Sequence, residues 1–255
     1  MNHNRTSRRQ TAIRWLHTTL ALLIGLSVLA GSSIPAGAEQ PGRSTELTAA
    51  YAQLLHRRFG IVLADRTGIW TAAEAHTILH GLNDLSEQFA RVAGDEADAT
   101  LKALFNGMVF YRDVDSRGYI AYTIAGTVSF YDLWASYDEE KRIFYLYHEM
   151  GHLLDTRTSL MHLLMGEVSN DFAGAVGAYT DERGEYQLGS SFPRRPGRPV
   201  YHRDDSASED WAESFATVMK PDYQSVQRNI GAQRKAAVEQ QVSKLAAQAG
   251  RFDVE

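Results

Sequence analysis

The sequence predicts an α+β domain in which helices surround one short group of strands. Apolar residues recur at helical spacing over 46–59, 71–89 and 137–157. Residues 108–133 are instead rich in β-branched and aromatic side chains, with turn residues between them, a composition typical of strands. Helical spacing returns after residue 206. This order predicts a mostly helical domain with one small sheet.

Residues 1–38 predict a secretory signal peptide. Four arginines precede an apolar stretch at 20–30, and there is no acidic residue among them. After the stretch, "AGA" at 36–38 matches a small-residue cleavage site. The stretch is short for a bilayer span, although an uncleaved anchor is the alternative. The pair Arg8 and Arg9 leaves both the Sec and the twin-arginine route open. We expect a secreted or extracytoplasmic chain with no stable membrane anchor after cleavage.

Composition narrows the chemistry of the remaining chain, which we expect to fold as one domain with an N-terminal helical part (39–107) and a catalytic part (108–255). Beyond the leader it holds 22 basic and 31 acidic residues, a formal charge of −9. A nucleic-acid partner is not expected, because such partners require a basic surface. The chain has no cysteine, so any metal site must use His, Asp or Glu.

Local patterns predict the elements that precede the strand-rich segment. Residues 46–59 have helical spacing and end before a glycine. "IVLAD" at 61–65 predicts a short buried strand. Thr71 and Glu74 have the spacing of a capping box and precede apolar residues at helical intervals. A further short helix is expected over 96–105.

The next patterns predict strands followed by a long helix. "MVFYRD", "GYIAYTIAG" and "TVSFYDLW" predict strands that pair antiparallel with one another. Ser136 and Glu139 again have capping-box spacing, and they open a helix over 137–157. Downstream we expect a loop over 190–199, a helix from Ser206 or Ser208 to the residue before Pro221, and a last helix over 223–249.

The long helix contains "HEMGH", an HExxH motif. His148 and His152 are one turn apart, so both imidazoles can bind one zinc ion. Glu149 lies beside that position and can act as the base that takes a proton from the zinc-bound water. The alternative is a core helix that carries two histidines among aromatic residues.

A third zinc ligand is expected from "SEDWAESFAT". Glu209 and Glu213 are one turn apart, so one can bind zinc while the other accepts a hydrogen bond from a histidine ligand. Trp211 and Phe215 lie on another face and are expected in the core. The alternative is a solvated acidic face. Asp155, three residues after the second histidine, either supports the site from the same helix or caps a neighbouring polar group.

"HEMGHLLD" followed by "EDWAESFA" resembles the glutamate-zincin (gluzincin) metallopeptidases, and most of all the branch of the anthrax lethal factor catalytic domain and the secreted Pro-Pro endopeptidases. The resemblance implies a zincin-like metallopeptidase domain with a small mixed sheet packed on the HExxH helix. It implies His148, His152 and Glu209 as Zn²⁺ ligands, Glu149 as general base and Glu213 as the supporting carboxylate.

The same resemblance raises the question of an oxyanion donor. The family places a tyrosine about seven residues before its glutamate ligand, whereas this chain has His202 there, preceded by Tyr201. Both are candidate hydrogen-bond donors to an oxyanion. "GTVSFYD" is expected as the edge strand with which a peptide could pair, or as an ordinary sheet strand. The insert 158–205 is either a loop that frames the substrate or a surface connection.

These features predict a secreted zinc-dependent endopeptidase that hydrolyses peptide bonds through a zinc-bound water activated by Glu149. Its partner would be a protein or peptide substrate. One alternative is a non-catalytic zincin-fold binding or envelope protein. Another is a toxin or effector protease with one protein target. The sequence carries no signal for an oligomeric state.

Overall fold

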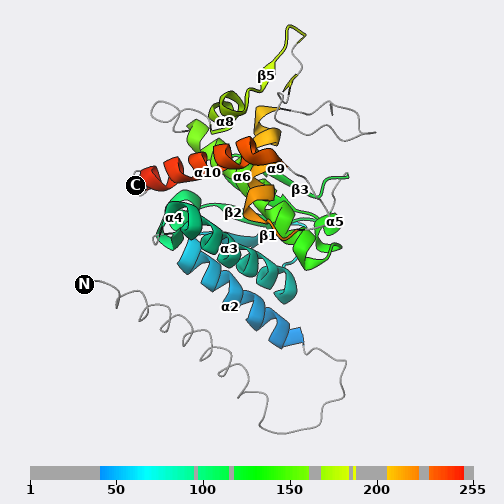
Figure 1. The fold of residues 1–255 in the computed structure, drawn as a ribbon. Helices are drawn as coiled ribbons and strands as arrows, with labels where there is room; N and C mark the ends of the chain where they lie inside the picture. Colours follow the sequence, from blue (N-terminus) through cyan, green and yellow to red (C-terminus); the bar gives the residue numbers. More distant parts are fainter. Residues whose placement is uncertain are drawn as a thin grey trace, which may run out of the picture. The chain divides into compact units, whose positions relative to one another are not determined.

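Helices and a small sheet together form the chain, as expected of an α+β protein (Figure 1). The computed structural model describes residues 41–94, 97–114, 118–160, 168–183, 186–187, 206–223 and 230–249. The predicted signal peptide and the predicted loop at 190–199 lie outside these ranges. Within them, no helix is both long enough and apolar enough to cross a membrane.

The first described helices confirm the predictions for this region. Helix α2 (Pro41–Phe59) lies beside α3 (Ala72–Ala93), and α4 (Ala97–Phe105) packs against both (Figure 1). The capping box at the start of α3 is present, because the Thr71 side chain accepts from the Glu74 amide and Glu74 accepts from the Thr71 amide at 2.8 Å. The buried apolar residues of α3 include Ile78, Leu82, Leu85 and Phe89.

Four short strands form a mixed sheet with the order β1-β2-β4-β3. They are β1 (Val62–Asp65), β2 (Val109–Arg112), β3 (Ala121–Ile124) and β4 (Thr127–Phe130). The pairs β1–β2 and β2–β4 are parallel, and only β3–β4 is antiparallel. The expected antiparallel pairing is therefore wrong for β2. After β2 the chain forms β3 at the edge of the sheet. A tight turn then reverses the chain, and β4 fills the position between β3 and β2.

That tight turn explains the single antiparallel pair. Ala125 and Gly126 both have positive φ values, 47° and 78°, as a two-residue hairpin turn requires. Because β4 enters the sheet between β2 and β3, "GTVSFYD" is an inner strand, and the prediction that it forms the edge is wrong. The edge next to β4 is β3. The other edge is β1, so the expected burial of this strand is also wrong: Val62 is 39% exposed.

The residues after β4 turn away from the sheet as a short helix, α5 (Asp132–Ala135), although "TVSFYDLW" was expected to continue as a strand. The side chain of Trp134 is buried, and its indole donates to the carbonyl of Arg142 at 3.0 Å. Burial of this large ring fixes the approach of the chain to the long helix that follows.

The HExxH motif lies on α6 (Glu139–Leu160). Asp138 accepts from the Lys141 amide at 2.8 Å in the manner of an N-cap. Ser136, the predicted cap, instead donates to the carbonyl of Leu133 at 2.7 Å. The predicted capping box of Ser136 and Glu139 is therefore wrong, because Ser136 is the C-cap of α5 and the long helix starts at Glu139, after Asp138.

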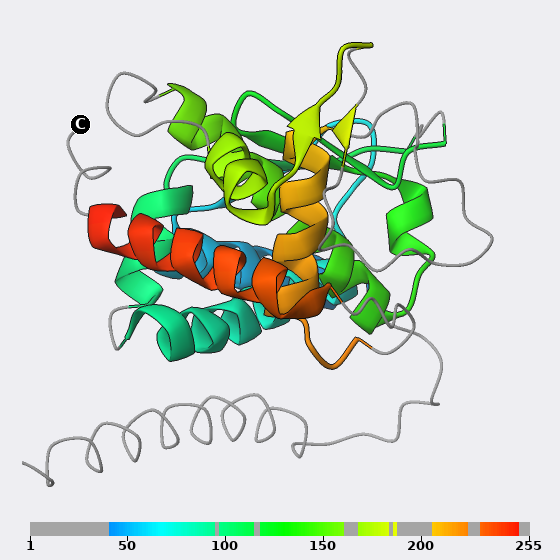
Figure 2. The same cartoon turned by 45° about the horizontal axis from the view of Figure 1, so that its top comes forward.

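Beyond α6 the structure describes α8 (Val168–Val176), the short strands β5 (Tyr179–Thr180) and β6 (Tyr186–Gln187), α9 (Ala207–Met219) and α10 (Gly231–Gln248). The insert between the two motifs therefore contains a helix and a hairpin. Ser206, one of the two expected positions, is the N-cap of α9. Helix α10 starts later than expected. It lies between α3 and α8, and α9 lies next to its N-terminal end (Figure 2).

Candidate metal centre

Close packing of α6 against α9 brings the two sequence motifs together. A Cβ atom on Gly151 would lie 2.8 Å from the Cα atom of Ala212, so the backbones approach more closely than larger residues would permit. The indole of Trp211 donates to the carbonyl of Gly151 at 2.9 Å. Trp211 and Phe215 are fully buried, as expected for the apolar face of α9. This contact fixes the position of α9 along the axis of α6.

In this arrangement of the two helices, His148, His152 and Glu209 converge, and each offers a ligand atom within 4.8 Å of the other two. The Nε2 atoms of the two histidines are 3.1 Å apart. Glu209 reaches both of them, with Oε2 at 3.4 Å from His148 Nε2 and Oε1 at 3.3 Å from His152 Nε2. The structure therefore brings together the three residues that the sequence predicts as metal ligands.

The donor set and its spacing fit a zinc ion. Tetrahedral zinc with ligand distances of about 2.0–2.1 Å separates its donor atoms by about 3.3 Å. In this cluster the two Nε2 atoms are 3.1 Å apart, and each lies 3.3–3.4 Å from a different carboxylate oxygen of Glu209. Two imidazoles and one carboxylate are also typical ligands of catalytic zinc, which keeps a further position open. The side chain of Glu209 is 46% exposed, whereas those of the two histidines are 15% exposed, so the cluster opens to solvent on the side of Glu209.

Glu209 is held in its ionised form. Partial burial raises the pKa of this carboxyl, but hydrogen bonds and charge interactions with His148 and His152 outweigh that effect. The resulting pKa lies well below the usual range of a glutamate. A ligand that is already deprotonated loses no proton when a cation binds.

The outer nitrogen of each histidine faces a side chain of α9. His152 Nδ1 lies 3.1 Å from Ser208 Oγ, and His148 Nδ1 lies 3.7 Å from Glu213 Oε2. The first contact is within hydrogen-bond distance, and such a bond orients an imidazole and selects its tautomer, whereas the second is longer than a hydrogen bond. Glu213 therefore lies where a supporting carboxylate is expected. Ser208 was considered only as a possible helix start, and its position next to Glu209 in the first turn of α9 was the one signal of a role at the site.

Glu149 points from α6 toward the sheet. It is 5% exposed, and its Oε2 atom accepts a hydrogen bond of 2.6 Å from the hydroxyl of Thr123 on β3. Thr123 could not be predicted, because no spacing rule relates a strand residue to the helix that follows it in the chain. The carboxylate of the predicted base is thus bound to the edge strand of the sheet.

Asp155 has a partner away from the cluster. Asp155 Oδ1 accepts from the backbone amide of Ser169 at 2.9 Å, in the first turn of α8, which matches the capping alternative. Tyr201 and His202, the candidate oxyanion donors, lie outside the described residues.

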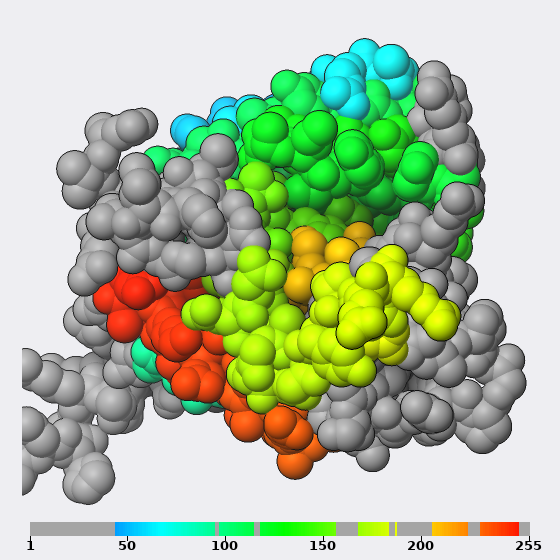
Figure 3. Space-filling view, turned by 90° about the horizontal axis from the view of Figure 1, so that it is seen from above, coloured from blue at the N-terminus to red at the C-terminus, as the bar shows by residue number. Residues whose placement is uncertain are grey.

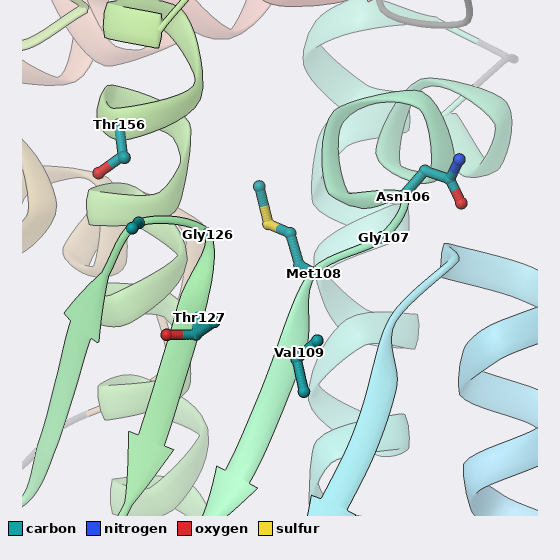
Figure 4. A pocket seen from close by; sticks show the side chains of 8 residues that line it. Asn106, Gly107, Met108, Val109, Gly126, Thr127 and Thr156 are labelled. Atoms are coloured by element: carbon teal, nitrogen blue, oxygen red, sulfur yellow. The ribbon is translucent and has the colours of Figure 1, made fainter. Parts of the chain in front are cut away.

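The surface has a hollow over α9, and a separate pocket lies near the sheet. From above, the orange residues of α9 are visible at the bottom of a hollow between green and yellow-green parts of the chain (Figure 3). A separate pocket of about 180 Å³ lies at the starts of β2 and β4 (Figure 4). Its lining includes Asn106, Met108, Val109, Thr127 and Thr156 and contains no charged residue and none of the candidate site residues.

Comparison with protein-family models, with curated proteins and with solved structures gives no match for this chain.

Proposed function

We propose that this chain is a zinc-dependent endopeptidase with a zincin-like catalytic domain. The observation that supports this function best is the convergence of His148, His152 and Glu209 from two separate helices, with Glu149 beside the first histidine. An HExxH helix alone arises by chance in some chains. A third ligand at matching distances from a second helix is a much more demanding coincidence.

The three converging residues would hold the metal. Bound zinc would act as a Lewis acid toward the scissile carbonyl and the attacking water. Ser208 and Glu213 would orient the two imidazoles from the far side of each ring.

Glu149 would perform the proton transfers. Its carboxylate accepts the proton of the attacking water, and the protonated carboxyl then donates that proton to the nitrogen of the leaving amine. The group starts and ends each turnover as a carboxylate, so the protons balance. Its burial beneath β3 protects the transferred proton from bulk water.

The substrate would be an extended peptide that pairs with β3. Among the described residues, β3 pairs with β4 alone, so its other edge is turned away from the sheet. Tyr122 and Ile124 are 48% and 57% exposed on the side of β3 that faces away from Glu149. These two side chains would contact apolar side chains of the peptide. The predicted export signal would deliver such an activity outside the cytoplasm.

The first experiment measures zinc in the purified protein from residue 39 onward. We expect about one zinc per chain, lost or sharply weakened in Glu209→Ala, because this variant removes one of three protein ligands. Glu87→Ala, on the exposed face of α3, is the matched control and should retain zinc. Absence of zinc binding after reconstitution would rule out the proposed site.

The same preparation then tests catalysis with a library of unstructured peptides. Glu149→Gln should retain zinc and lose hydrolysis, because the amide cannot accept the proton of water. Cleavage of many peptides supports an endopeptidase, and cleavage of one protein alone supports the effector alternative. Zinc binding without any cleavage would favour the non-catalytic binding protein instead.

A further inference from the structure

The hydrogen bond between Thr123 and Glu149 joins two elements with different proposed tasks. Thr123 lies on β3, the strand proposed to hold the peptide, and Glu149 lies on the HExxH helix. In the sheet register Thr123 pairs with Val128, a fully buried residue of β4. The threonine side chain therefore points toward the helix side of the sheet, and Tyr122 and Ile124 point to the other side.

The distances identify the acceptor of the threonine proton. Thr123 Oγ1 lies 2.6 Å from Glu149 Oε2 and 3.4 Å from the backbone carbonyl oxygen of Glu149. A hydroxyl has one proton to donate, and the shorter contact to a charged acceptor is much the stronger of the two. Thr123 therefore donates to the carboxylate.

This bond engages only one of the two carboxylate oxygens. Within the described part of the chain, Oε2 accepts from Thr123 and no hydrogen bond is made to Oε1. A glutamate side chain has three rotatable bonds, so a buried carboxylate needs a partner to keep one orientation. With Oε2 held, Oε1 is the oxygen that remains for a water molecule.

We propose that Thr123 is a positioning residue for the reaction: its hydroxyl holds the Glu149 carboxylate so that Oε1 faces the attacking water. This inference rests on the proposed peptidase function and assigns the position of the base to the strand that binds the peptide. A peptide paired with β3 would fix Thr123, and Thr123 would fix the base. Peptide binding and base orientation would thus depend on one strand.

A merely structural role predicts something different. In that case the bond would only help to pack the β3–β4 hairpin on α6, and its loss would lower stability without changing the orientation of Glu149 or kcat. Thr123→Val retains the shape and the strand preference of threonine and removes the donor. Thr123→Ser restores the donor. Thr127→Val removes a hydroxyl from the other strand of the same hairpin, where it donates to the carbonyl of Ile124 at 2.8 Å.

The test has two readouts on these three variants. In crystal structures of the metal-free proteins, Thr123→Val should show Glu149 in a changed or multiple orientation, whereas Thr123→Ser and Thr127→Val should retain that of the wild type. In peptide hydrolysis by the zinc-loaded proteins, Thr123→Val should lower kcat about tenfold to a hundredfold, with KM little changed, and serine should restore most of the loss.

The outcomes separate this inference from the proposed function. If the wild-type protein cleaves peptides and Thr123→Val cleaves them equally fast, Thr123 does not position the base although the peptidase proposal stands. An unchanged Glu149 orientation in the metal-free valine variant overturns the inference even when no peptide is cleaved. The inference would also be overturned if Thr127→Val lowered kcat as much as Thr123→Val. A hydroxyl that does not contact Glu149 would then have the same effect on the rate.

Discussion

At the scale of single residues, the candidate site depends on what holds each functional side chain. His152 and Glu149 each have a hydrogen-bond partner beyond the cluster, Ser208 and Thr123. The imidazole of His148 faces Glu213 at 3.7 Å. Partners of this kind reduce the number of orientations that a side chain must give up when a ligand binds. They therefore affect affinity and rate without touching the substrate.

Ser208 provides a direct test of this effect. Ser208→Ala removes the hydroxyl that lies 3.1 Å from His152 Nδ1. We expect the zinc dissociation constant to rise about tenfold or more, because the imidazole loses the contact that selects its tautomer. Competition with a fluorescent chelator measures this constant.

Ser243→Ala is the matched control for that measurement. Ser243 lies on α10 and donates to the carbonyl of Glu239, away from the cluster. Its removal should leave zinc affinity unchanged. Equal affinities of the Ser208→Ala variant and the wild type would show that Ser208 does not support His152.

At the scale of secondary structure elements, the approach of α6 to α9 decides whether the three candidate ligands meet. Gly151 lies between the two histidines and leaves room for the backbone of Ala212. A similar close approach occurs where Gly81 of α3 faces Leu146 of α6, where an added Cβ would lie 2.9 Å from a leucine methyl. Both contacts hold the HExxH helix in place, but only that at Gly151 bears directly on the third ligand.

Gly151→Ala tests this contact. The added methyl would meet the Cα atom of Ala212 at 2.8 Å, so the helices must separate. We expect a loss of about 1–3 kcal/mol in the free energy of unfolding, as is typical of overpacking, together with weaker zinc binding. Urea unfolding of the metal-free protein measures the first effect.

Gly174→Ala is the control for this prediction. Gly174 lies within α8, and a Cβ there would meet nothing within 4 Å among the described residues. This change should raise stability by about 0.4–1 kcal/mol, because alanine restricts the unfolded chain. If Gly151→Ala behaved in the same way, the close packing of α6 and α9 would be contradicted.

At the scale of the whole molecule, ion pairs at the ends of the parallel strands connect stability to pH. Asp113 follows β2 and accepts from Arg66 and from the hydroxyl of Thr67. The hydrogen bond from Arg66 is the main reason that its pKa is lowered to about 2, and burial opposes this effect. Arg66 also lies over the ring of Tyr111, which holds the guanidinium near the carboxylate.

Because the pKa of Asp113 is lower in the folded chain, the unfolded chain binds the proton first as the pH falls. The stability from this ion pair is therefore present above about pH 4 and is lost progressively toward about pH 2. Asp113→Asn should lower stability at neutral pH and make the loss between these pH values shallower. Urea unfolding of the metal-free protein over this range tests the sign.

Asp222→Asn serves as the control for this pH series. Asp222 is an exposed residue after α9. Its variant should retain both the stability of the wild type at neutral pH and the slope of the acid limb. An Asp113→Asn variant with an unchanged acid limb would show that the pair with Arg66 does not contribute to acid unfolding.

Local patterns in the sequence determined most of the helices and limited the candidate ligands. The one-turn spacing of His148 and His152 places both on one helix face, and the same rule applies to Glu209 and Glu213. The capping box at Thr71 and the start of α9 at Ser206 were equally local, because a cap involves residues within one turn. The absence of cysteine limited a metal site to His, Asp and Glu.

Only the tertiary structure decided the relations between segments that are distant in the chain. Strand order is one of them: β4 lies inside the sheet and β3 at its edge, because the hairpin turn reverses the chain and composition does not record where it docks. The contacts of Ser208 with His152 and of Thr123 with Glu149 are others. Spacing rules act within one element, whereas these contacts depend on how elements pack, and packing follows from the shape of the whole core.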